Sequence, residues 1–187
     1  MANEFIALDF ETANNSPNSA ISIGMVKFRD YAPVSTYYSL IRPPQLYIPP
    51  GFTAIHGLVV DDVKDSPDFK TCWENEAKDF IGDSILAAHF ALFDMGILRA
   101  VLKWYQLDIP KLSYFCTCIL SRRAWPDFTS HSLPKLADRF GIVYNAHNAL
   151  DDALTCGKLV QLAAEKYGGG KNVNELLKAA GMRLKTL

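Results

Sequence analysis

Two carboxylates near the amino terminus stand one residue apart, directly after a short apolar run. The run covers residues 5–8, and Asp9 and Glu11 follow it. Because side chains alternate across a β-strand, residues two positions apart point to the same side, so both carboxylates converge on one small volume. Two anions held that close need a cation. The alternative interpretation is a solvent-exposed strand end that carries two acids.

A further acidic residue, Asp94, follows a second apolar run. That run, residues 85–88, is short and wholly apolar, as is typical of a strand covered on both faces. Open α/β sheets place their ligand sites beyond the ends of such strands, so Asp94 is well placed for chemistry. The alternative is an acid in the first turn of a helix, where the helix dipole favours a negative charge.

A fourth carboxylate opens a long predicted helix, residues 149–167. At three- and four-residue steps Asp152 shares a face with apolar residues such as Cys156, whereas Asp151 falls on the polar face. A carboxylate on an apolar face requires a partner such as a metal ion, a lysine or an arginine. His147 precedes this helix on a loop and can reach the same point, although a loop histidine on its own is usually a surface residue.

The elements that must position these residues predict a single α/β domain with a mixed sheet flanked by helices. Strands are expected over residues 5–8, 21–28, 37–41, 85–88 and 114–118. Helices are expected over residues 73–81, 93–104, 133–140 and 149–167. Prolines at positions 43, 44, 49 and 50 predict a surface connection without regular structure.

Composition limits the function classes. The chain has 187 residues, of which 49% are hydrophobic, enough for one domain with a proper core. Neither a signal peptide nor an apolar stretch long enough to span a bilayer is evident, so we expect a cytoplasmic protein without a membrane partner. The net charge of -1 argues against a strongly basic, nonspecific DNA binder. It does not exclude a nucleic-acid substrate, because metal binding by the carboxylates would leave the remaining surface mildly positive.

The four cysteines favour neither a zinc site nor a nucleophile. Only Cys116 and Cys118 are close in sequence, and no second pair completes a structural zinc site. Cys156 lies on the inner face of the helix that follows His147, without the exposed position that activates a thiol. We expect buried, reduced thiols.

In order and spacing, the acidic residues resemble the motifs of the DEDDh 3′-to-5′ exonucleases, the DnaQ-like superfamily that includes the epsilon proofreading subunit of bacterial DNA polymerase III. The matching motifs are Asp9-x-Glu11, His89-x4-Asp94 and His147-x4-Asp152, supported by Ile55-His56-Gly57 and by the lead-in over residues 131–142. The resemblance covers about residues 5–165.

Two positions refine this resemblance. The sister group with tyrosine in the last motif places it where this chain has Asn148, and Tyr144 lies too far upstream, so the histidine version fits better. Phe90 stands where the family often has asparagine, which affects local hydrogen bonding and substrate preference but removes no metal ligand.

The resemblance implies a ribonuclease H-like fold, with an exonuclease domain over residues 1–168 and a basic segment over residues 169–187 that forms a helix or an arm. It implies two Mg²⁺ or Mn²⁺ ions held by Asp9, Glu11, Asp94 and Asp152, because oxygen ligands suit these ions better than zinc. His147 would be the general base. The last nucleotides would contact Thr12, Ile55, His56 and Phe93.

Three functions remain open. The first is a 3′-to-5′ exonuclease that releases nucleoside 5′-monophosphates from single-stranded or frayed DNA ends in proofreading or repair. The second uses the same machinery on RNA or short oligoribonucleotides. The third is a catalytically silent nucleic-acid or protein-interaction module, which retention of all five reactive residues disfavours. Beyond a nucleic-acid 3′ end, a separate polymerase subunit and a second copy of the chain are left open as partners.

Overall fold

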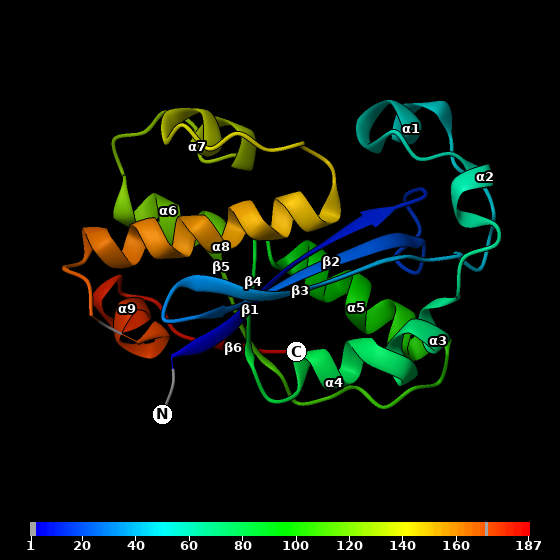
Figure 1. Cartoon of the computed structure of the whole chain (residues 1–187), viewed down its shortest axis with the longest axis horizontal. Coiled ribbons are helices and arrows are strands. Elements are labelled where there is room, and N and C mark those ends of the chain that lie inside the picture. Colours follow the sequence, from blue (N-terminus) through cyan, green and yellow to red (C-terminus); the bar gives the residue numbers. More distant parts are fainter. Residues whose placement is uncertain (1–2, 171) are drawn as a thin grey trace.

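Six strands form one mixed sheet in the order β3-β2-β1-β4-β5-β6 (Figure 1). The computed structural model describes residues 3–170 and 172–187. The strands are β1 (Glu4–Thr12), β2 (Ala20–Arg29), β3 (Ala32–Leu40), β4 (Ile85–Ala88), β5 (Ser113–Cys116) and β6 (Lys185–Thr186). The first three strands form an antiparallel meander, β4 and β5 continue the sheet in parallel with β1, and β6 returns antiparallel to β5.

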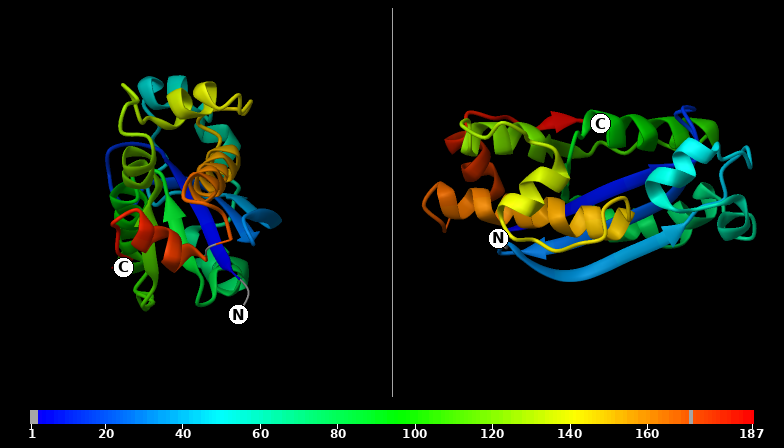
Figure 2. Two further views of the ribbon diagram at one scale, coloured as in Figure 1. Left: turned by 90° about the vertical axis from the view of Figure 1, so that its left-hand side faces the viewer. Right: turned by 90° about the horizontal axis from the view of Figure 1, so that it is seen from above.

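Helices cover both faces of this sheet (Figure 2). One face carries α5 (Leu92–Trp104) and a continuous helical run made of α3 (Phe69–Cys72), the π-helical turn η1 (Trp73–Ala77) and α4 (Lys78–Ile81). The other face carries α6 (Thr117–Ala124), α8 (Ala149–Lys166) and α9 (Val173–Ala179). The predicted single α/β domain with a mixed, helix-flanked sheet is confirmed.

The alternation along β1 divides the core between the two faces. Ile6 and Leu8 are buried in the cluster that includes the inner side of α5. Phe5 and Ala7 are buried in the cluster that includes the inner side of α8. Asp9 and Glu11 continue the second series, so their side chains emerge on the α8 side of the sheet.

The first turn of α8 approaches the sheet very closely beside Asp9. Gly24 is paired with Asp9 across β1 and β2. A Cβ atom at Gly24 would overlap the carbonyl group of Ala149 and the amide nitrogen of Leu150. Because no side chain separates strand from helix here, the beginning of α8 lies directly next to the end of β1.

Two expectations about local structure are wrong. Residues 50–56 form the short helix α1 (Pro50–His56) although prolines precede and begin it, because proline at the first helical position gives up an amide that a helix leaves unbonded anyway. The strand expected to reach Cys118 ends at Cys116, and α6 begins at Thr117. The remaining short helices are α2 (Val60–Val63) and α7 (Leu133–Arg139).

The C-terminal segment packs onto the domain. Val173, Leu176 and Leu177 of α9 are buried in the same cluster as Phe5 and Phe28. The chain then adds β6 to the edge of the sheet at β5. Among the described residues, no helix combines the length and apolar character that crossing a bilayer would require.

Candidate active site

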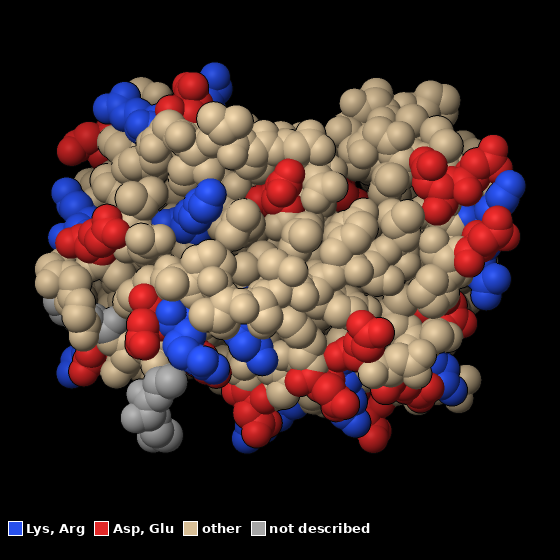
Figure 3. All heavy atoms as spheres, viewed as in Figure 1, with Lys and Arg blue, Asp and Glu red and all other residues tan. Residues whose placement is uncertain are grey.

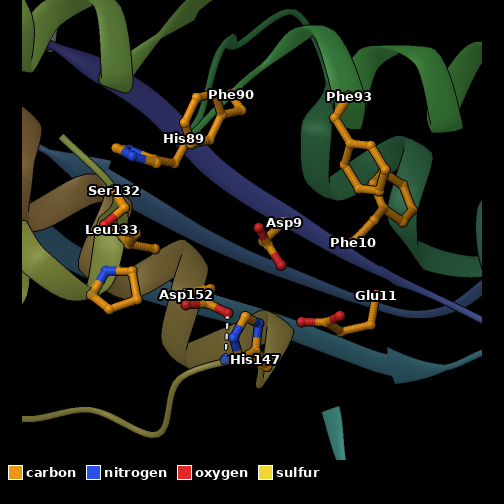
Figure 4. Close-up of a pocket in the computed structure, with 11 residues that line it drawn as sticks. Asp9, Phe10, Glu11, His89, Phe90, Phe93, Ser132, Leu133, His147 and Asp152 are labelled. Carbon is orange, nitrogen blue, oxygen red and sulfur yellow. Dashed lines mark hydrogen bonds between the residues drawn. The ribbon is translucent and has the colours of Figure 1, made fainter. Parts of the chain in front are cut away.

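A cavity of about 410 Å³ lies where the ends of β1 and β4 meet the first turns of three helices (Figure 4). The strand ends contribute acidic and aromatic groups, and the helices α5, α7 and α8, with the loops that lead into α7 and α8, contribute the rest. Its lining residues are Asp9, Phe10, Glu11, His89, Phe90, Phe93, Ser132, Leu133, Pro134, His147 and Asp152.

One side of this cavity is a group of potential metal ligands. Single ligand atoms of Glu11, His147 and Asp152 all lie within 4.8 Å of one another. The carboxylate of Asp9 points into the same space (Figure 4). The loop before α8 holds the side chain of Asp152 in place, because the backbone amide of His147 donates a hydrogen bond to Asp152 Oδ2 at 2.9 Å.

His147 has a left-handed backbone, with φ of 63°. Histidine is among the few side chains enriched in this conformation. The turn lets its amide bond Asp152 while its side chain stays exposed beside the acidic group. Asn148 then caps α8, because its side-chain oxygen accepts hydrogen bonds from the backbone amides of Leu150 and Asp151.

Asp94 lies behind the cavity wall rather than in it. Its side chain is buried, and the backbone amide of Phe10 donates a hydrogen bond to its Oδ1 at 3.2 Å. Its charge is close enough to raise the pKa of Asp9. The structure therefore brings together Asp9, Glu11, Asp94, Asp152 and His147.

The four residues predicted to contact nucleotides are placed differently from one another. Phe93 lines the cavity and is half-exposed. Ile55 on α1 is also half-exposed, so neither residue is packed in the core. His56 accepts a hydrogen bond at Nδ1 from the Leu58 amide and lies near the buried Thr12. Thr12, Ile55 and His56 are not among the residues that line the cavity.

An exonuclease family model, RNase_T, matches residues 6–160. The chain belongs to this exonuclease family. The 3′-5′ exonuclease DinG of Staphylococcus aureus strain MRSA252 is 32% identical over 166 residues, which cover 87% of this chain and 18% of that protein. DinG of strain USA300 is 31% identical with the same coverage. The chain thus spans less than a fifth of the length of these curated relatives.

Solved structures of nucleases share the fold. Exonuclease X in complex with 5′-overhanging duplex DNA has a TM-score of 0.72 at 24% identity, covering 95% of this chain and 99% of that one. Cell-death related nuclease 4 has a TM-score of 0.75 at 14% identity, covering 99% of this chain and 81% of that one. The predicted family and its ribonuclease H-like fold are confirmed.

The four acidic residues form a crowded, partly buried cluster in which the carboxyl groups resist ionisation. Burial raises the pKa of Glu11 to about 8, with further contributions from the charges of Asp152 and Asp94. Burial likewise raises the pKa of Asp94 to about 8 and that of Asp152 to about 6, and it raises the pKa of Asp9 well above its ordinary value. No Lys or Arg occurs among the described residues lining the cavity, so the lining itself supplies no permanently charged cation to balance these acids.

This donor set fits a divalent metal ion. Asp94 Oδ2 is buried and has no hydrogen-bond partner among the described residues, which is costly for a carboxylate unless a cation neutralises it. Carboxylate oxygens with one imidazole suit Mg²⁺ or Mn²⁺. The cysteines stay outside this set: all four are free thiols, and three of them are buried.

The melting temperature of the metal-free protein is expected to fall as the pH rises from about 6.5 to about 8. Glu11 and Asp94 have pKa values raised to about 8 in the folded protein, so the folded state binds more protons than the unfolded chain in this window and loses stability as pH rises. The buried, neutral ring of His89 acts in the opposite direction, but only over the lower part of this window, because histidines in the unfolded chain are half protonated at about pH 6.5 and almost fully deprotonated by about pH 7.5. Saturating Mn²⁺ should raise the melting temperature by about 5 °C or more at the upper pH. Thermal scans in EDTA and in Mn²⁺ test this, and a metal-free melting temperature that rises with pH would contradict it.

His89 holds the cavity wall together rather than facing the acids. Its ring is buried, with Nδ1 2.9 Å from the hydroxyl of Thr117 and Nε2 2.9 Å from the carbonyl oxygen of His131. A carbonyl only accepts, so Nε2 carries the proton, and burial lowers the pKa of His89 to about 4, which keeps the ring neutral. The bond fixes the segment that leads into α7, and with it the wall formed by residues 132–134.

The side chain of Tyr144 lies near the acidic cluster, although its position in the sequence is too far upstream to match the tyrosine motif of the sister group. Burial raises its pKa, and the nearby charges of Asp152 and Asp9 add to this effect, so its hydroxyl lies close to the acidic cluster. The loop between α7 and α8 brings it back toward Asp152, and no periodic pattern in the sequence reports the path of such a loop.

Proposed function

We propose that this chain is a metal-dependent 3′-to-5′ exonuclease that acts on single-stranded or frayed DNA ends and releases nucleoside 5′-monophosphates. The observation that carries the proposal is the meeting of three carboxylates and an exposed histidine at one cavity, with Asp94 buried behind its wall, in a chain of the exonuclease family. The proposal concerns this domain, since the curated relatives are more than five times as long as the part that matches it.

Asp9, Glu11, Asp94 and Asp152 would hold two Mg²⁺ or Mn²⁺ ions. When bound, such ions supply an activated water and neutralise charge on the phosphate oxygens and the leaving oxygen. The acids are spread over β1, α5 and α8, so the sheet and both helix layers fix their relative positions. Rigid placement of this kind avoids reorganisation during the reaction.

His147 would act as the general base. A ring nitrogen takes a proton from the attacking water, a new P–O bond forms, the bond from phosphorus to the 3′ oxygen of the preceding nucleotide breaks, and this oxygen takes up a proton from solvent. The exposed ring can afterwards pass this proton to solvent. An imidazole suits the role because its ordinary pKa lies close to neutral pH.

DNA is proposed as the preferred polymer, and RNA is the alternative. Exonuclease X, which shares the fold, was solved with duplex DNA bound, and this supports DNA for the present chain without excluding RNA. Proofreading or repair is the biological setting we propose, with a separate polymerase subunit as a candidate partner. A labelled oligonucleotide assay separates the polymers directly. Stepwise 3′ shortening of 5′-labelled DNA in Mg²⁺ or Mn²⁺, blocked by EDTA and slower on matched RNA, is the expected result. No shortening of either polymer would exclude the activity.

The His147→Asn variant is expected to lose about 10²–10⁴-fold in turnover, the usual contribution of a general base. Asparagine tolerates the left-handed backbone at this position, and the side chain is exposed, so the melting temperature should stay within about 2 °C of the wild-type value. Single-turnover release of the terminal nucleotide measures the chemical step. Turnover within a factor of about three of wild type would remove His147 from the mechanism.

A further inference from the structure

Phe90 adopts a backbone conformation that a bulky side chain rarely tolerates. Its φ is 62°, in the left-handed region. Aromatic residues are true outliers there, and such strain persists only where the surrounding structure enforces it. Among the described non-glycine residues with positive φ, Phe90 and His147 are the two that line the cavity.

The strained backbone directs an aromatic ring into the cavity instead of the core. Phe90 is 53% exposed, yet it lines the cavity with Phe93. Its ring meets the ring of His89 edge-on, with centroids 5.2 Å apart and planes at 86°. Since His89 is held by two hydrogen bonds, it supports the ring of Phe90 and leaves the remaining aromatic surface free.

The cavity offers little else that could bind a polynucleotide apart from its metal ligands. None of its described lining residues is a lysine or an arginine. The visible face in Figure 3 agrees, because the surface between α7 and α1 is largely uncharged with acidic atoms in it. Besides its metal ligands, this lining offers stacking on aromatic rings as a source of affinity for single strands, and one aromatic platform contributes roughly tenfold per base.

We propose that Phe90 is a nucleobase-stacking residue that, together with Phe93, receives the unpaired bases at the 3′ end of a single-stranded polynucleotide. Figure 4 places both rings on one side of the cavity and the carboxylates of Asp9, Glu11 and Asp152 on the other. A strand whose bases lie on the rings therefore presents its backbone to the acidic group. The assignment rests on the proposed exonuclease function and adds to it a preference for ends with unpaired, intact bases.

The decisive variant is Phe90→Asn, because asparagine tolerates a left-handed backbone but offers no aromatic face. The melting temperature should equal or exceed that of wild type. KM for single-stranded DNA should rise about tenfold, with kcat changed by less than about twofold. The separate variant Phe90→Tyr, which keeps an aromatic ring, should have the wild-type KM. On an oligonucleotide whose last two nucleotides are abasic, wild type and Phe90→Asn should have the same KM, since no base remains to stack.

Leu92→Asn is the matched control, because Leu92 is a more exposed apolar residue of the same turn that does not line the cavity. Its KM should stay at the wild-type value. Fluorescence anisotropy with a labelled oligonucleotide in EDTA reports binding without turnover, so an inactive wild type would overturn the proposed function while Phe90 is still tested. An unchanged dissociation constant in Phe90→Asn, or a loss that persists on abasic ends, would overturn the stacking role alone.

Discussion

Replacing Asp9 with asparagine should abolish turnover while making the metal-free protein harder to unfold. Asp9 is the carboxylate most surrounded by like charge: burial raises its pKa, and Asp94, Asp152 and Glu11 each add to the increase. Asparagine keeps the shape and removes one charge from this group. Loss of a residue that only hydrogen-bonds to a metal ligand reduces activity by roughly 10–100-fold. Asp9 would bind the metal directly, so we expect a much larger fall in activity.

The same change should raise the melting temperature in EDTA by roughly 2–4 °C, the shift that about 1 kcal/mol produces in a chain of this size. The stabilisation that Mn²⁺ gives to wild type should largely disappear. Asp108→Asn serves as the control, because this exposed carboxylate lies beyond the other end of α5. Thermal scans and single-turnover assays on both variants test the prediction. An active Asp9→Asn enzyme, or one that is less stable without metal, would show that Asp9 is not a ligand in a repulsive cluster.

Gly24→Ala should damage both stability and catalysis, although Gly24 is not a ligand. The added methyl group would overlap backbone atoms of Ala149 and Leu150, which cannot rotate away as a side chain would. Overpacking of this kind costs about 1–3 kcal/mol. The first turn of α8 must move off the sheet, and it carries Asp152 away from Asp9. A displacement of about 1 Å at a catalytic site reduces turnover by about 100-fold.

Gly96→Ala in α5 is the matched control. A Cβ atom at Gly96 meets no atom within 4 Å, so alanine should stabilise this helix by about 0.5–1 kcal/mol and leave activity intact. Urea denaturation gives the free energy of unfolding for both variants, and exonuclease assays give turnover. If Gly24→Ala unfolds and turns over like wild type, the close contact between α8 and the sheet does not position the site.

Much of the site follows from local sequence patterns. Asp9 and Glu11 share a side because a strand alternates, and Asp152 faces inward because a helix repeats. Both inferences need only the period of one element. The family resemblance adds the order of the motifs, and the match over residues 6–160 confirms the family.

The periodicity of single strands and helices did not predict three other features of the structure. The position of Asp94 behind the wall, bonded to the Phe10 amide, depends on how α5 packs against β1. The sequence identified His89 only as part of a motif. Its contacts with Thr117 and His131 show that its ring stabilises the cavity wall. Proline at the first position of α1 allowed a helix where proline content predicted none.

The sequence by itself determined which face of its own element each candidate side chain occupies and, through the order of its motifs, the family to which the chain belongs. The face that a side chain occupies depends on neighbours a few residues away, and backbone periodicity fixes it. Only the tertiary structure decided how close the elements approach: the contact of α8 with β2 at Gly24, the return of Tyr144 toward Asp152, and the exposure of Phe90. Such distances arise from packing between segments far apart in the chain, which no local pattern contains.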